Sequence, residues 1–242
     1  LDEFNETVVI DIVSVTNGTE KNGFQQQTVT ILDNDTTLVS LSVQNTNVDE
    51  NTGLTATKVK ASMTLLSSQI VTANLQKSGT AREFSNNTPT GGSDYSLPNT
   101  IDIPPGALSA EVTFASTADL LDEFDETVVI EIISVTNGTE LNEQSQTITI
   151  LDGNVPANVS LLVGAPTINE SISGNSTSVT AQLDIVSAKN MTVTLSKSGT
   201  ATDTTATPDY NLASISLFIA AGTTATTTTL TSLGDIVDEA NE

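Results

Sequence analysis

Short segments in which apolar and polar residues alternate run along most of the chain. In the segment 127–136, Val128, Ile130 and Ile132 occupy alternate positions, and Glu131 lies between two of them. Because successive side chains of a β-strand point to opposite faces, this pattern predicts a strand with one buried and one exposed face. No segment favours the 3.6-residue period of an amphipathic helix. The sequence therefore predicts an all-β protein.

Segments of this kind recur between residues 37 and 154, separated by clusters of Gly, Pro, Asn and Asp. Short, regularly spaced strands with turn residues between them are typical of an antiparallel sandwich. The predicted strands are 38–44, 57–65, 69–78, 100–103, 107–116, 127–136 and 146–151. This order predicts an immunoglobulin-like, seven-stranded Greek-key sandwich.

A long internal repeat defines the domain organisation. The segment 1–20 returns at 121–140, a shift of 121 − 1 = 120, and differs only at Asn5/Asp125, Asp11/Glu131 and Val13/Ile133. Self-similarity over such a distance predicts tandem copies of one module. We expect 1–35 to be the last part of a preceding repeat, 36–154 a complete repeat and 155–242 the first part of a following repeat. A longer array explains this layout, with a circular permutation as the alternative.

The composition excludes several classes of function. The chain has 30 acidic and 7 basic residues, a net charge of −23, and neither His nor Cys. It therefore has no Ser-His-Asp triad, thiolate nucleophile, disulfide or zinc site of the usual ligands. The negative charge disfavours nucleic acid and anionic membranes as partners, and no apolar segment is long enough to insert into a membrane. Paired carboxylates also serve glycosidases, but duplicated acidic loops and an aromatic content of 3% argue against an enzyme.

Acidic residues concentrate directly before the segment 127–136. Five of the eight residues from 119 to 126 are acidic, and like charges in one loop repel one another unless a cation neutralises them. Further acids, Glu50, Asp94 and Asp152, lie at the ends of other predicted strands, and in a Greek-key sandwich such loops can converge at one pole. Oxygen ligands without His or Cys favour Ca²⁺. A solvated run of charge is the alternative interpretation.

The loop 119–126 has the form Asp-x-x-x-Glu-x-x-Glu, leads into an apolar strand, and is followed by a final strand with the short acidic tail 152–154. This pattern resembles the Calx-beta domain. The pairs Asp94-Tyr95 and Asp209-Tyr210 match the family as well, and the resemblance spans the whole chain. It implies tandem Calx-beta sandwiches with Ca²⁺ as the cofactor. The tail Asp152-Gly153-Asn154 has fewer carboxylates than the three consecutive Asp common in the family, which implies fewer or weaker ions.

The resemblance also implies calcium ligands in each copy. In the complete repeat they are Glu50, Asp94, Asp119, Asp122, Glu123, Asp125, Glu126, Asp152 and Asn154. In the preceding copy they are Glu3, Glu6, Asp33 and Asp35. In the following copy they are Glu170, Asp209, Asp235, Asp238, Glu239 and Glu242. Both terminal sets lack part of their own module and are expected to be incomplete.

The expected function is a calcium-binding stalk repeat of an extracellular adhesin or filament at a bacterial cell surface, in which calcium rigidifies the array. Its partners would be the neighbouring repeats, with a cell-surface or carbohydrate ligand bound by other regions. The alternatives are a calcium-sensing regulatory module and a carbohydrate- or ice-binding surface. The Thr-rich segment 222–231 raises the last alternative, but its counterpart 106–115 is not Thr-rich.

Overall fold

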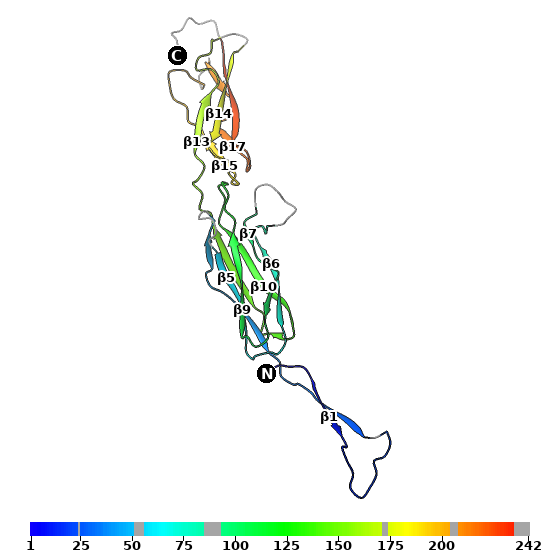
Figure 1. The fold of residues 1–242 in the computed structure, drawn as a ribbon. Coiled ribbons are helices and arrows are strands. Elements are labelled where there is room, and N and C mark those ends of the chain that lie inside the picture. The colour runs from blue at the N-terminus through cyan, green and yellow to red at the C-terminus, as the bar shows by residue number, and fades with distance from the viewer. Residues whose placement is uncertain (24, 51–55, 85–92, 171–173, 204–207, 235–242) are drawn as a thin grey trace. The chain divides into compact units, whose positions relative to one another are not determined.

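The computed structural model shows a chain of strands and loops (Figure 1). It describes residues 1–242 except 24, 51–55, 85–92, 171–173, 204–207 and 235–242. These described residues contain no helix, so none of them forms a membrane-spanning helix, and the prediction of an all-β fold is confirmed. Contacts divide the chain into two compact units. The first comprises Leu1–Ala118 and Glu126–Leu151, and the second comprises Asp119–Asp125 and Asp152–Glu242.

Most of the first unit is a sandwich built from two five-stranded sheets. One sheet has the order β4-β12-β10-β6-β8, with bounds Asn47–Asp49, Ser145–Leu151, Glu126–Thr136, Val71–Gly79 and Thr100–Ile103. The other has the order β11-β3-β5-β9-β7, with bounds Thr139–Glu140, Leu38–Val43, Ala56–Met63, Ser109–Ser116 and Tyr95–Ser96. Buried residues of both sheets belong to one hydrophobic cluster, which is the core of the sandwich.

All seven strands predicted for the complete repeat are present, and β8 has the predicted bounds. The remaining strands, β4, β7 and β11, are two or three residues long. A pattern with a period of two residues cannot be recognised over so short a segment. The sequence therefore predicts the strands that form the core and misses the short strands at the sheet edges.

The strand β10 lies between β6 and β12, and its inner face supplies the centre of the core. Val128 and Ile130 are fully buried and Ile132 nearly so, while Glu131 is exposed, as the alternating pattern predicts. Tyr95 is buried as well, and its ring stacks on Phe114 with the centroids 5.1 Å apart. Burial raises the pKa of Tyr95 to about 12, so the ring stays neutral. Tyr95 is thus an anchor of the sandwich.

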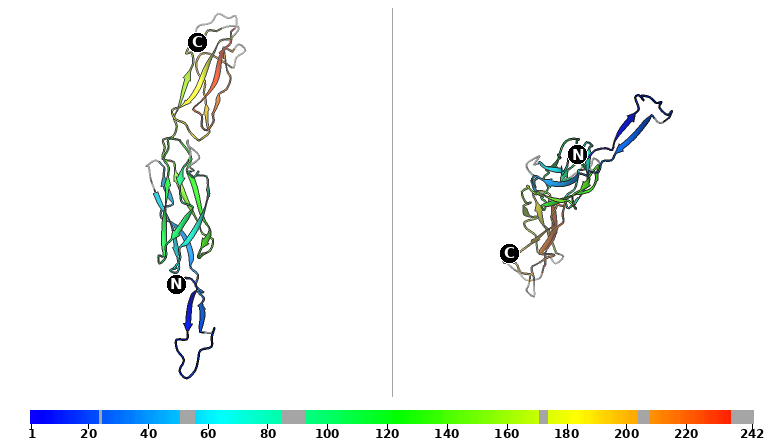
Figure 2. Two further views of the ribbon diagram at one scale, coloured as in Figure 1. Left: turned by 45° about the vertical axis from the view of Figure 1, so that its right-hand side comes forward. Right: turned by 90° about the horizontal axis from the view of Figure 1, so that it is seen from below.

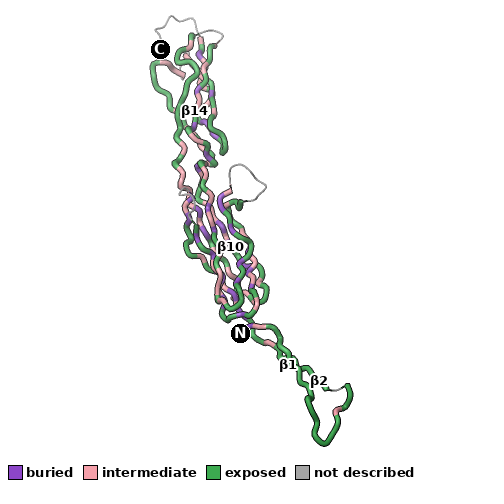
Figure 3. Tube along the Cα trace, in the orientation of Figure 1, coloured by how far each residue is buried: buried purple, intermediate pink, exposed green. Residues whose placement is uncertain are grey.

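The first unit also contains a separate hairpin made of β1 (Glu6–Asp11) and β2 (Gln26–Ile31), which among the described residues pair only with each other (Figures 1 and 2). All residues of both strands are exposed (Figure 3). By the repeat, this hairpin corresponds to β10 and β12, and the pair Val8↔Val29 matches the pair Val128↔Ile148. The two copies therefore fold into the same hairpin locally, although only one of them is part of a core.

The second unit contains a four-stranded sheet of order β13-β14-β18-β16 and a two-stranded sheet of β15 and β17. Their bounds are Val159–Val163, Ser176–Leu183, Ala225–Ser232, Tyr210–Leu212, Met191–Thr194 and Ser216–Ile219. These strands correspond in order to β3, β5, β9, β7, β6 and β8 of the complete repeat. A smaller core forms around Ala181, Leu183, Leu217 and Ile219.

Gly79, the last residue of β6, should tolerate substitution less well than another glycine with a positive φ. Its φ is +122°, and a Cβ atom there would lie 2.1 Å from the carbonyl oxygen of Thr127. Gly106 also has a positive φ, +76°, but a Cβ there would meet no atom within 4 Å. We expect Gly106→Ala to lower the free energy of unfolding by about 1–2 kcal/mol, and Gly79→Ala by about 1–3 kcal/mol more because β10 must move. Urea denaturation measures both. Equal losses would contradict this account of Gly79.

Candidate metal centre

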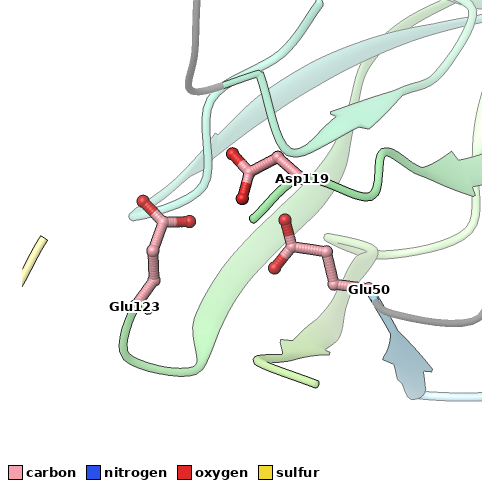
Figure 4. Close-up of side chains that lie close together, drawn as sticks. All are labelled: Glu50, Asp119 and Glu123. Carbon is pink, nitrogen blue, oxygen red and sulfur yellow. The ribbon is translucent and has the colours of Figure 1, made fainter. Parts of the chain in front are cut away.

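Three acidic side chains, Glu50, Asp119 and Glu123, form a group that can hold a metal ion (Figure 4). Each offers one carboxylate oxygen, and these oxygens all lie within 4.8 Å of one another. Glu50 follows β4 and is 4% exposed, whereas Asp119 and Glu123 are half-buried in the loop between β9 and β10. The structure thus brings together three of the predicted ligands, from two segments about 70 residues apart.

The spacing of these oxygens is compatible with a shared calcium ion. Calcium binds oxygen ligands at about 2.3–2.6 Å, so two ligands of one ion lie at most about 5 Å apart. Without a cation the carboxylates repel one another, since two unit charges about 4 Å apart near a protein surface interact with about 4 kcal/mol. A divalent ion replaces this repulsion with attraction. The arrangement is therefore suited to binding a hard cation through carboxylate oxygens.

Hydrogen bonds between the acidic loop and the tail after β12 fix the position of Glu123. Its backbone N–H donates to Oδ2 of Asp152 at 3.1 Å, and the backbone N–H of Asp152 donates to Oδ1 of Asp125 at 3.0 Å. Within the loop, the N–H of Leu121 donates to Oδ1 of Asp119 at 2.7 Å. Asp152 and Asp125 were predicted as ligands, and here their carboxylates accept backbone hydrogen bonds. They lie outside the group of three.

The preceding copy makes the same hydrogen bonds between loop and tail. The N–H of Glu3 donates to Oδ2 of Asp33 at 2.9 Å, and the N–H of Asp33 donates to Oδ1 of Asn5 at 2.9 Å. The N–H of Asp35 also donates to Oδ1 of Asp33, at 3.3 Å. The hydrogen bond from the N–H of Glu3 is the main reason why the pKa of the Asp33 carboxyl lies below its ordinary value. The loop conformation is thus a local property of the repeated sequence.

Asp122, in the middle of the acidic loop, has a different environment. Its side chain is 1% exposed and accepts hydrogen bonds from Nζ of Lys189 at 2.6 Å, Oγ of Ser187 at 2.8 Å and the N–H of Ala157 at 3.3 Å. Burial by itself would raise the pKa of the Asp122 carboxyl, but the hydrogen bonds outweigh it, and the pKa lies below its ordinary value. Lys189 also lies 3.5 Å from Asp152. Asp122 therefore anchors the acidic loop in the second unit, and its negative charge is paired with the Lys189 side chain.

The counterpart of Asp122 in the preceding copy is Asp2. Its N–H donates to the carbonyl oxygen of Leu66 at 3.0 Å, and its carbonyl oxygen accepts from Ser68 at 2.8 Å. The residue that corresponds to Lys189 is Gln69, since 189 − 120 = 69. The contact of Asp122 with Lys189 was not predicted. The sequence signal for this contact is weak, because only one of the two aligned positions, 69 and 189, holds a basic residue.

The remaining candidates lie at several places in the fold. Oδ2 of Asp94 accepts the N–H of Arg82 at 2.5 Å, and Oδ2 of Asp209 accepts the N–H of Thr202 at 2.6 Å, so both carboxylates order the loop before a short strand. Glu126 is the first residue of β10, and Glu6 is the first residue of β1. Glu170 is exposed. Nδ2 of Asn154 donates to the carbonyl oxygen of Leu121. Asp235, Asp238, Glu239 and Glu242 lie outside the described residues. For all of these, a ligand role stays a prediction.

Comparisons with known proteins give matches among solved structures. No protein-family model matches the sequence, and neither does any curated protein. The calcium-binding domain CBD12 of CALX1.1 is 19% identical and covers 78% of this chain and 73% of its own, with a TM-score of 0.36. CBD12 from CALX1.2 is also 19% identical and covers 77% of this chain and 72% of its own, again with a TM-score of 0.36. The apo form of the Calx CBD1 domain is 17% identical and covers 50% of this chain and 100% of its own, with a TM-score of 0.35.

The ion pair of Asp122 and Lys189 predicts a defined change in stability. We expect Lys189→Gln to lower the free energy of unfolding of the second unit by about 1–3 kcal/mol at pH 7, because Asp122 stays buried without its cation. Lys60→Gln is the matched control, since Lys60 and Glu111 form an exposed pair at 4.0 Å; there the loss should be below about 1 kcal/mol. Urea denaturation measures both losses.

The pH dependence of this pair follows from the directions of its pKa shifts. Burial alone would lower the pKa of Lys189, but Asp122 and Asp152 raise it. The lowered pKa of Asp122 stabilises the fold above about pH 3.9, and this contribution is lost as the pH falls through the shifted pKa. The raised pKa of Lys189 stabilises the fold below about pH 10.4 and is lost at higher pH. The difference between wild type and Lys189→Gln should therefore be constant around neutral pH and change only in acid and in strongly alkaline solution. A difference that changes near pH 7 would contradict the assignment.

Proposed function

We propose that this chain is a calcium-binding structural module of an extracellular tandem-repeat protein, and that it has no catalytic role. The group of Glu50, Asp119 and Glu123 is the observation that carries the proposal. Its ligands are all carboxylates, the chain contains no His or Cys, and the chain is strongly acidic. These features favour calcium over zinc or other metals that prefer nitrogen and sulfur ligands.

Calcium would act on the structure through the loop Asp119–Asp125. This loop carries two of the three ligands, and between them in the sequence lies Asp122, which is buried within the second unit. An ion that holds Asp119 and Glu123 in place therefore also restricts the segment that presents Asp122 to Lys189. In an array of such repeats, one ion in each loop would stiffen the connection between successive copies.

A stalk at a bacterial cell surface is the setting that we propose for this module. The near-identity of 1–20 and 121–140 supports this setting. Recently duplicated copies suit a protein whose function requires length or repetition, whereas regulation favours two diverged sites. Calcium is abundant outside cells, where modules with dissociation constants of about 10⁻⁴–10⁻³ M are loaded. The neighbouring repeats are the expected partners.

Calcium should raise the melting temperature of the chain. An ion that binds only the folded state stabilises it by about 1.4 kcal/mol when its concentration is about ten times the dissociation constant. Glu50→Gln and Glu123→Gln should each weaken calcium binding at least about tenfold in a calorimetric titration, since each removes a charged ligand. In chelator their stability should equal or exceed that of the wild type, because repulsion is relieved.

Glu131→Gln is the matched control for these variants, since Glu131 is exposed on the outer face of β10. It should leave the calcium affinity unchanged. Identical melting curves in chelator and in millimolar calcium would contradict the proposed function. A similar loss of affinity in Glu131→Gln would show that calcium responds to the net charge and not to this group.

The stiffening of an array is tested separately on a chain of several whole repeats. Small-angle scattering should show a narrower distribution of conformations in calcium than in chelator, because the loop that precedes each β10 is then held by its ion. If the two distributions coincide while calcium still binds, the ion stabilises single modules and does not stiffen the array.

A further inference from the structure

Lys77 is a lysine whose side chain lies on the inner face of the sandwich. It is directly opposite Ile130 in the pairing of β6 with β10, and Ile130 is fully buried. Because opposite residues of an antiparallel pair share one face, the Lys77 side chain extends along the core side of its sheet. This side chain is only 7% exposed. Its amino group is therefore largely withdrawn from water, and its chemistry depends on the groups around Nζ.

Three oxygen atoms surround Nζ of Lys77. Nζ donates to Oδ1 of Asn99 at 2.6 Å, to the carbonyl oxygen of Leu97 at 2.9 Å and to Oε1 of Glu83. The carbonyl oxygen of Asn99 accepts the N–H of Leu75 at 2.8 Å, which ties this residue to β6. Since Oδ1 is bonded to Cγ at about 1.2 Å, Nζ lies within about 3.8 Å of the carboxamide carbon of Asn99. The structure thus holds an amine, an amide carbon and a carboxylate together.

This arrangement is close to that of reactants in an acyl transfer. A nucleophile held about 3–3.5 Å from its target reacts far faster than the same groups free in solution. Glu83, the acid beside the amine, is fixed in the fold because it forms a parallel bridge with Tyr95. The N–H of Phe84 also donates to the carbonyl oxygen of Tyr95, at 2.7 Å. Both the nucleophile and its neighbouring acid are therefore positioned by the sandwich.

The second unit has the same ion pair. Lys197 and Asp203, which lie 120 positions after Lys77 and Glu83, are joined by a hydrogen bond from Nζ to Oδ2. Nζ of Lys197 also lies over the ring of Tyr210, 5.9 Å from its centroid. A lysine at this position is thus paired with an acid in both copies.

At the position of Asn99 the second unit has no amide. There the N–H of Leu195 donates to the carbonyl oxygen of Ile215 at 2.8 Å, as the N–H of Leu75 donates to that of Asn99. Ile215 therefore occupies the place of Asn99, and its side chain has no acyl group. Since the second unit forms its ion pair without an amide, Asn99 adds a reactive group to a pair that does not require it.

We propose that Nζ of Lys77 and Cγ of Asn99 form an intramolecular isopeptide bond, with Glu83 as the catalytic carboxylate. Glu83 accepts a proton from Nζ, and the neutral amine attacks Cγ. Glu83 then passes a proton to Nδ2 of Asn99, the bond from Cγ to Nδ2 breaks, and ammonia leaves. The net change converts an ammonium group and a carboxamide into a secondary amide and an ammonium ion. No oxidant, reductant or cofactor is consumed.

The bond would connect β6 covalently to the segment that leads into β8. It joins residues 22 positions apart, and such a cross-link stabilises a fold by restricting the unfolded chain. None of the three participating residues belongs to the group assigned to calcium. The outcome of the test is therefore independent of the proposed function.

The intact mass of the 242-residue chain, measured under denaturing conditions after prolonged incubation of the folded protein, tests this proposal. The wild type should be lighter than its sequence requires by one ammonia, about 17 Da. Lys77→Arg, Asn99→Ala and Glu83→Gln should each have the full mass of their sequences. Lys197→Arg is the matched control and should lose ammonia as the wild type does.

Fragmentation of a proteolytic digest should then show one branched peptide that contains both Lys77 and Asn99. Cyclisation at an Asn-Gly sequence such as Asn137-Gly138 also releases ammonia, but that loss would persist in Lys77→Arg. A wild type of full mass would overturn the proposal, and so would a loss that persists in Lys77→Arg or Asn99→Ala. A loss that persists in Glu83→Gln would overturn the catalytic role of Glu83.

Discussion

The burial of one face of β10 is the interaction on which the rest of the structure depends. Val128, Ile130 and Ile132 fill the centre of the core, and β10 is hydrogen-bonded to β6 on one side and β12 on the other. The nearly identical sequence in β1 forms a corresponding hairpin without this burial, and Asn17 and Asn137, which follow the two strands, adopt similar positive φ angles. Hairpin formation is thus encoded locally, whereas the sandwich requires the facing strands.

The position of β10 also determines where the acidic loop lies. The loop ends at Glu126, the first residue of the strand, so its carboxylates are placed by the rigid strand that follows and by the hydrogen bonds of Asp152 with Glu123 and Asp125. Its acids then have two roles. Asp122 is neutralised by Lys189 and fixes the loop, while Asp119 and Glu123 approach Glu50 and form the group that we assign to calcium. We propose that a loop with so many like charges is stabilised in part by the protein and in part by an ion.

The sequence predicts the elements of this fold better than the details of its site. Alternation identified all seven long strands, because a buried face leaves a period of two residues. Nine residues of the complete repeat were candidate ligands, and the structure groups three. Which three depends on how the loops after β4 and β9 approach each other, and this is set by long-range packing that no local pattern records. The contact of Lys189 with Asp122 joins residues 67 positions apart, and in the other copy a Gln stands in place of the Lys.

Of the predicted loops, the one after β4 and the one between β9 and β10 meet, and the claim that most depends on this approach is that a calcium ion lies among Glu50, Asp119 and Glu123. A crystal structure of the chain grown in millimolar calcium, with anomalous data, tests it most directly. The account predicts an anomalous peak with one oxygen of each of these three side chains about 2.3–2.6 Å away. Calcium bound at other residues, with these carboxylates turned apart, would contradict it.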